Sequence, residues 1–165
     1  MNLLLLLALI LLAAETPTAT PTDRAYLLVG NWHCETYAGS KATRTYTKVA
    51  NEPAINSTNT VRLPNGFYVV MREHYVYDVA TGSWAVDSPE SALWGAMHAS
   101  AEPWSEKQWI FTGIGALPGS KGRMLSQPIR MIYTALGENA FRRSHQIKGE
   151  QLWRNYSEEV CTRDE

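Results

Sequence analysis

The sequence predicts an all-β fold, a single antiparallel, up-and-down β-barrel of about eight to ten strands. Runs rich in Val, Ile, Thr, Tyr, Phe and Trp follow one another from Tyr26 onward, and glycine-containing turns separate many of them. Apolar and polar side chains alternate within several runs, which is typical of strands with one buried face. An open sheet of this size would leave unpaired edges, so we expect the sheet to close.

Length and charge limit the function classes. A chain of 165 residues with 45% hydrophobic residues can build one substantial core and is too short for two. The formal net charge of −1 provides no broad positive field for nucleic acid or an anionic membrane surface. We therefore expect one domain with no nucleic acid partner.

The first 14 residues predict a signal peptide. Leu3–Ala14 is an apolar run of twelve residues, and at about 1.5 Å of helical rise per residue it is too short to cross a hydrocarbon core of about 30 Å. The small residues Ala13 and Ala14 offer a cleavage site before Glu15. An uncleaved anchor is the alternative.

The rest of the chain divides into a spacer and a domain. Residues 15–24 are rich in Pro and Thr and predict an extended spacer, and residues 25–165 predict the barrel. The expected localisation is secreted or periplasmic, without stable membrane insertion.

Two cysteines stand near opposite ends of the predicted domain, Cys34 and Cys161. In an exported protein an even pair predicts a disulfide. It would stabilise the fold by about 4 to 5 kcal/mol in the chain-entropy model. Two buried free thiols are the alternative. Neither cysteine has a C-x-x-C or H-x-x-x-H companion, so we expect no metal site.

The expected strands follow the chain in order: Tyr26–Tyr37, Thr43–Val49, Thr58–Leu63, Gly66–Val79, Ser91–Ala99, Gln108–Ile114, Ile129–Leu136, Ala140–Ile147 and Gln151–Cys161. Glycine-containing turns are expected at 63–66, 80–83, 136–139 and 147–150. Ser88–Leu93 predicts a short helix, because Pro89 suits a first helical turn. Gly115–Pro128 is expected to form a long loop.

The run FYVVMREHYVYD shows how the barrel wall is expected to face. Alternation places one set of side chains on one face, Phe67, Val69, Met71, Glu73, Tyr75 and Tyr77. We expect this set to point inward. Glu73 is then a lone inward charge, which must be paired, hydrated or protonated.

Candidate ligand contacts come from this strand and from two later runs with similar alternation: Met71, Glu73, Tyr75, Trp109 and Tyr133. If the alternation is reversed, His74 and Arg72 point inward instead. An inward His74 could then bind haem iron or orient a polar group of a ligand.

The triplet GNW, Gly30 to Trp32, resembles the G-x-W signature that opens the first strand of lipocalins and of the wider calycin superfamily. The chain is most similar to secreted bacterial lipocalin-like domains, whose activity is not settled. The resemblance implies that Trp32 plugs one end of the barrel and that a late basic residue, Arg154 or Arg163, packs across its indole. A disulfide from the barrel to the C-terminal region is common in that family, which agrees with the cysteine pair.

The sequence departs from these families in three respects. A T-D-Y triplet is absent, and no long helix is expected between the last strands as in typical lipocalins. His33 and Cys34 stand where the haem-binding nitrobindin group has further glycines.

The sequence contains no motif of a known catalytic machinery. It has no G-x-S-x-G, no H-E-x-x-H and no Walker loop. We therefore expect a non-catalytic exported protein that needs no cofactor and binds a small, mostly apolar molecule inside the barrel.

Three alternatives stay open. A barrel hydrolase or isomerase could use Glu73 or His74, since a carboxyl in an apolar cavity has a raised pKa and can act as a general acid. A haem-binding barrel would use His74. An interaction module would instead present aromatic residues around Trp84, Trp94 and Trp104 on its outer surface.

Overall fold

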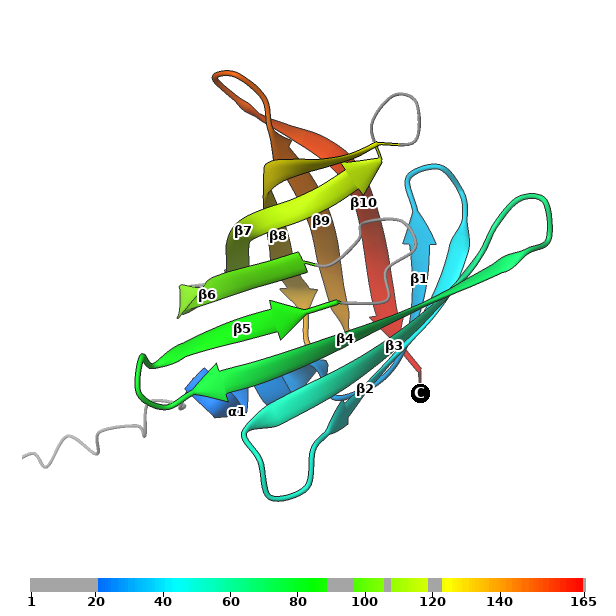
Figure 1. Cartoon of the computed structure of the whole chain (residues 1–165). Coiled ribbons are helices and arrows are strands. Elements are labelled where there is room, and N and C mark those ends of the chain that lie inside the picture. Colours follow the sequence, from blue (N-terminus) through cyan, green and yellow to red (C-terminus); the bar gives the residue numbers. More distant parts are fainter. Residues whose placement is uncertain (1–20, 89–96, 106–107, 119–122, 165) are drawn as a thin grey trace, which may run out of the picture.

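The computed structural model describes residues 21–88, 97–105, 108–118 and 123–164 (Figure 1). In this part of the chain ten antiparallel strands form a closed barrel. They are β1 (Gly30–Thr36), β2 (Lys41–Lys48), β3 (Ala54–Arg62), β4 (Tyr68–Asp78), β5 (Ser83–Asp87), β6 (Met97–Ser105), β7 (Gln108–Pro118), β8 (Met124–Gly137), β9 (Ala140–Lys148) and β10 (Trp153–Arg163). Each strand pairs with the next along the chain, and β10 pairs with β1. The predicted all-β, up-and-down barrel is confirmed.

A short helical segment precedes the first strand where the sequence predicted spacer and strand. It consists of α1 (Pro21–Ala25) and η1 (Tyr26–Leu28). Its last carbonyl groups are satisfied by side chains, since Trp32 Nε1 donates to Leu28 O at 2.7 Å and Arg163 Nη2 donates to Leu27 O at 2.5 Å. At five and three residues, the helices of the described part are too short to cross a bilayer.

The helical segment gives the barrel two distinct ends. Figure 1 shows α1 at the end where β4 finishes, and the turns joining β1 to β2, β3 to β4 and β9 to β10 at the opposite end. We call these two ends the helical end and the hairpin end of the barrel.

The predicted loop at Gly115–Pro128 is wrong for most of its length. Strand β7 continues to Pro118 and β8 begins at Met124, so that Pro128 pairs with Ile114. Gly115 leaves room for a neighbouring side chain rather than forming a turn, because a Cβ there would come within 2.8 Å of Ile129 Cδ1. The short helix predicted at Ser88–Leu93 lies, after its first residue, outside the described residues.

Buried aromatic rings fill the helical end of the barrel. We call them the aromatic plug: Trp32, Tyr46, Tyr75, Trp84, Trp109, Phe111, Tyr133 and Phe141. Ring centroids lie 4.7 Å apart for Trp32 and Phe141, and 4.6 Å apart for Trp109 and Phe111. Such separations are those of favourable aromatic pairs, so this half of the interior is packed by side chains.

Four of the residues to which the likeness to lipocalins assigned a structural role lie where β1 pairs with β10. They are Trp32, Arg163 and the two cysteines. A disulfide joins Cys34 on β1 to Cys161 on β10, so the two are not free thiols. The guanidinium of Arg163 lies 4.3 Å from the ring centroid of Trp32. Arg154 is exposed and lies beside the turn at Gly149, away from Trp32.

Candidate ligand-binding site

Strand β4 points Met71, Glu73 and Tyr75 of the predicted set into the barrel, whereas Phe67 precedes the strand and is 70% exposed. Met71, Glu73 and Tyr75 are buried. His74 lies on the outer wall, where its Nδ1 is 2.6 Å from Asn56 Oδ1 on β3. The face of β4 that carries Glu73 therefore points inward, and the reversed arrangement, with His74 in the interior, does not occur.

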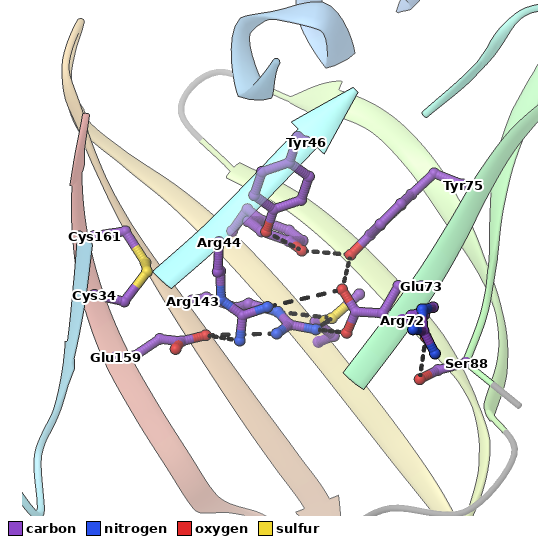
Figure 2. Close-up of polar contacts among 12 residues, drawn as sticks. Cys34, Arg44, Tyr46, Arg72, Glu73, Tyr75, Ser88, Arg143, Glu159 and Cys161 are labelled. Carbon is purple, nitrogen blue, oxygen red and sulfur yellow. Dashed lines mark hydrogen bonds and ion pairs between the residues drawn. A yellow bond between two sulfur atoms is a disulfide. The ribbon is translucent and has the colours of Figure 1, made fainter. Parts of the chain in front are cut away.

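Four buried charged residues meet in the middle of the barrel (Figure 2). We call Arg44, Glu73, Arg143 and Glu159 the buried tetrad; all four are at most 7% exposed. Arg44 Nη2 lies 2.5 Å from Glu159 Oε1, and Arg143 Nη1 lies 3.5 Å from the same oxygen. Arg143 Nη2 also donates to Glu73 Oε1, and Arg44 Nη1 lies 3.9 Å from Glu73 Oε2. Two guanidiniums and two carboxylates thus balance one another.

Three tyrosine hydroxyls join the tetrad to the aromatic plug. Tyr75 donates to Glu73 Oε2 at 2.6 Å, the hydroxyls of Tyr75 and Tyr133 are 2.6 Å apart, and those of Tyr133 and Tyr46 are 3.3 Å apart. Burial raises the pKa of each phenol, and well above its ordinary value for Tyr75 and Tyr133. The hydroxyls therefore remain protonated.

The pKa of the Glu73 carboxyl is lowered, whereas the alternative of a general acid in an apolar cavity needs a raised one. Burial alone would raise the pKa of its carboxyl, but Arg143, Arg44 and the Tyr75 hydroxyl outweigh burial and bring it below the ordinary value. Of the three states open to an inward Glu73, the structure has the paired one, with two guanidiniums that the sequence did not reveal. Glu73 is an ionised structural partner.

His145 faces the interior next to the tetrad. It stands two residues from Arg143 on β9, and its Nδ1 is 2.9 Å from Ser157 Oγ on β10. Burial, followed by the charges of Arg143 and Arg44, holds the pKa of this imidazole well below its ordinary value. His145 is therefore neutral at pH 7.

The inner face of β3 carries buried polar atoms without hydrogen-bond partners. Asn59 is 0% exposed and pairs in register with Arg44 on β2 and Met71 on β4. Within the described part of the chain, both side-chain polar atoms of Asn59, the Ser57 hydroxyl, and Nε and Nη1 of Arg44 make no hydrogen bond. We call Arg44, Ser57 and Asn59 the polar wall. These atoms of the wall lack hydrogen-bond partners among the described residues, whereas the neighbouring tyrosine hydroxyls and the His145 imidazole have them.

Sequence reasoning missed most of this site. The missed residues are Arg44, Ser57, Asn59, Arg143 and Glu159. Alternation was an available signal, since Arg44 lies between the inward Ala42 and Tyr46 in KATRTYTK. The predicted contacts Trp109 and Tyr133 belong to the aromatic plug, with ring centroids 5.9 Å apart.

A concavity lies on the outer wall. It measures about 600 Å³ and spans β10, β1, β2, β3 and β4; its exposed lining includes His33, Lys41, Thr43, Arg62, Tyr68 and Thr162. Among the described residues no aromatic patch forms around Trp84, which is 1% exposed in the core. Trp94 and the side chain of Trp104 lie outside what the structure describes.

No protein-family model matches the sequence, and no curated protein matches it significantly. The likeness to lipocalins therefore rests on the barrel itself and on Gly30 to Trp32 at the start of its first strand.

Proposed function

We propose that this chain is an exported, non-catalytic binding protein that holds a small, mostly apolar molecule in the hairpin half of its barrel. The main support for the proposal is that buried polar atoms of the polar wall lack hydrogen-bond partners among the described residues. A buried polar group without a partner costs about 1 to 3 kcal/mol, and native proteins keep few of them. A ligand that supplies the missing hydrogen bonds would remove this cost.

The apolar body of the ligand has partners beyond the tetrad. Val61, Met71 and Ile129 point inward there, and each is 6 to 8% exposed, whereas the plug residues are at most 3% exposed. Nearer the hairpin end, Val69 and Ile147 are half-buried. Exposure that rises toward the hairpin end favours entry from that side.

The protonation states of the buried Glu73 and its neighbouring tyrosines bear on the choice between binding and catalysis. The Glu73 carboxylate is ionised and held by Arg143 and Tyr75, and the tyrosines around it are protonated donors. No group of this set is poised to exchange a proton near neutral pH. This supports a carrier or sensor over a hydrolase or isomerase.

Titration with diphenylhexatriene, a hydrocarbon that fluoresces in apolar sites, tests the proposal. The rise in its fluorescence reports transfer into an apolar site, and two variants locate that site. Val61→Phe narrows the hairpin half and is expected to weaken binding at least about tenfold, while Tyr68→Ala on the outer wall is expected to leave it unchanged. Circular dichroism checks that both variants fold.

Two results would overturn the proposal. One is an absence of binding to the full-length, disulfide-bonded protein. The other is binding that survives Val61→Phe and is lost in Tyr68→Ala, which would assign the probe to the outer concavity.

Export has its own test. The intact mass of protein recovered outside the cytoplasm is expected to correspond to a chain that begins at Glu15. Recovery of the full-length mass from that fraction would contradict cleavage.

A further inference from the structure

We infer that the ligand carries a neutral carboxamide, and that the polar wall of Arg44, Ser57 and Asn59 is the site that binds it. This inference rests on the proposed function and specifies the ligand's chemistry.

The hydrogen-bonding capacity of the wall selects the group. Nε and Nη1 of Arg44 can only donate, and the Asn59 amide nitrogen donates as well. These donors require an acceptor oxygen on the ligand. Asn59 Oδ1 is also unpartnered and accepts, so an N–H on the ligand completes the set. A carboxamide supplies both, whereas an ether or a ketone supplies only the acceptor.

The charge of the site selects a neutral ligand. The buried tetrad already pairs two guanidiniums with two carboxylates, and Arg44 belongs to both the tetrad and the wall. A ligand carboxylate would add an uncompensated negative charge beside Glu73 and Glu159, and an ammonium would add a positive one beside Arg44. In a buried site either charge is costly, while an amide dipole is not.

The register of the strands brings the wall together. Asn59 lies directly across from Arg44, and Ser57 lies two residues nearer the helical end, across from Glu73. On the other side of Asn59 are Met71, its cross-strand partner, and Val61, two residues nearer the hairpin end. A polar head held at Asn59 therefore points an alkyl chain toward the hairpin end.

A purely structural role does not account for Asn59. Several other inward polar groups satisfy one another, as in the pairing of His145 with Ser157 and of Tyr75 with Glu73, whereas Trp84 Nε1 in the aromatic plug also lacks a hydrogen-bond partner among the described residues. A leucine at position 59 would place apolar volume against Met71 and Val61 without burying an amide. A partner that arrives from outside the chain would satisfy the amide of Asn59.

Competition among three ten-carbon probes tests the inference. Decanamide, decanoate and decylamine are each titrated against bound diphenylhexatriene on the full-length, disulfide-bonded protein. Decanamide is expected to bind at least about tenfold more tightly than either charged probe. Equal or tighter binding of decanoate or decylamine would overturn the inference.

Substitutions then assign the site. Asn59→Leu is expected to weaken decanamide binding about tenfold more than it weakens diphenylhexatriene binding. Ser57→Ala, a smaller change, is expected to weaken decanamide about threefold and keeps the inference testable if Asn59→Leu fails to fold. Thr58→Val on the outer face of β3 is the matched control.

The outcomes separate the two proposals. If diphenylhexatriene binds but Asn59→Leu and Ser57→Ala leave decanamide affinity unchanged, the inference is wrong and the binding function stands. If the hydrocarbon itself does not bind, the proposed function fails and the inference fails with it.

Discussion

The carboxylate of Glu73 on β4 and the guanidinium of Arg143 on β9 meet inside the barrel, although their strands are not neighbours in the sheet (Figure 2). Arg143 also lies against Met131 Sδ and over the ring of Tyr133. The pair therefore connects β4 and β9, which are distant strands of the barrel, through the interior. Each charge depends on the other for compensation, because both are almost fully buried.

Removing one member of this pair is expected to be costly. Glu73→Gln leaves two buried guanidiniums against one carboxylate, and we expect a loss of about 3 to 5 kcal/mol in the free energy of unfolding. Glu73→Gln combined with Arg143→Met removes one charge of each sign and is expected to recover more than half of that loss. Urea unfolding with the disulfide intact measures both values.

A partly exposed pair is the control for that experiment. Arg142 Nε lies 3.6 Å from Glu158 Oε1, and Arg142→Ala is expected to cost about 0.5 kcal/mol or less. A Glu73→Gln cost as small as that of Arg142→Ala would contradict the stabilising role of Glu73.

The disulfide is expected to stabilise the pairing of β1 with β10. It links residues 127 positions apart, so the Cys34→Ala/Cys161→Ala variant should lose about 4 to 5 kcal/mol in the chain-entropy model. Unfolding of the wild type with and without reductant provides the comparison. Equal midpoints in urea for the oxidised protein and the double variant would be inconsistent with this prediction.

Acid is expected to destabilise the fold through His145. Its folded pKa is depressed by burial, Arg143 and Arg44, so its contribution is fully present above the ordinary value of 6.5 and is lost as the pH falls toward the folded value. Below about pH 6.5 the free energy of unfolding should fall with a slope approaching 1.4 kcal/mol per pH unit.

Variants identify the group behind that slope. His145→Gln is expected to flatten the profile between about pH 6.5 and about pH 4.5, above the range in which the lowered pKa of Glu73 begins to contribute. His74→Gln, which removes an imidazole from the outer wall, is the matched control. An unchanged slope in His145→Gln would exclude this histidine as the cause.

The stability of the helical end of the barrel should depend on Arg163. Besides stacking on Trp32, its guanidinium donates to Val29 O at 2.7 Å and to Leu27 O. Arg163→Ala is therefore expected to cost about 2 to 3 kcal/mol, and the exposed Arg154→Ala should cost under about 0.5 kcal/mol. Thermal unfolding distinguishes the two variants. A similar loss of stability in both would show that Arg163 does not stabilise the helical end.

Gly30 is expected to tolerate no side chain. Its φ of 135° favours glycine, and a Cβ would come within 2.7 Å of Arg163 Nη1. Gly30→Ala should lower the free energy of unfolding by at least about 1 kcal/mol, whereas Gly39→Ala, in an open turn of positive φ, tests the backbone effect alone. Equal costs would show that contact with Arg163 contributes nothing.

Alternation and turn chemistry were sufficient to predict the barrel and the inward face of β4. Met71, Glu73 and Tyr75 follow a period of two, and one face had to be buried. The cysteine pair was predicted because only two cysteines exist in the chain.

The tetrad and the polar wall required knowledge of packing across the barrel. Arg44 and Glu159 lie in stretches rich in Thr, Ser and Glu, which locally resemble solvated strands. Strand register across the closed sheet, which no local pattern reveals, brings them to Glu73 and Arg143. The strands around Gly115 and Pro128 were missed because these residues usually mark turns, whereas here they lie in paired strands.

A crystal structure of the full-length protein with decanamide would decide whether the polar wall binds a ligand amide. We expect the amide group inside the barrel, with its oxygen within hydrogen-bond distance of Asn59 Nδ2 and its alkyl chain directed past Val61 toward the hairpin end. Decanamide bound in the outer concavity beside Tyr68, or an interior in which Asn59 is satisfied without it, would contradict this role of the wall.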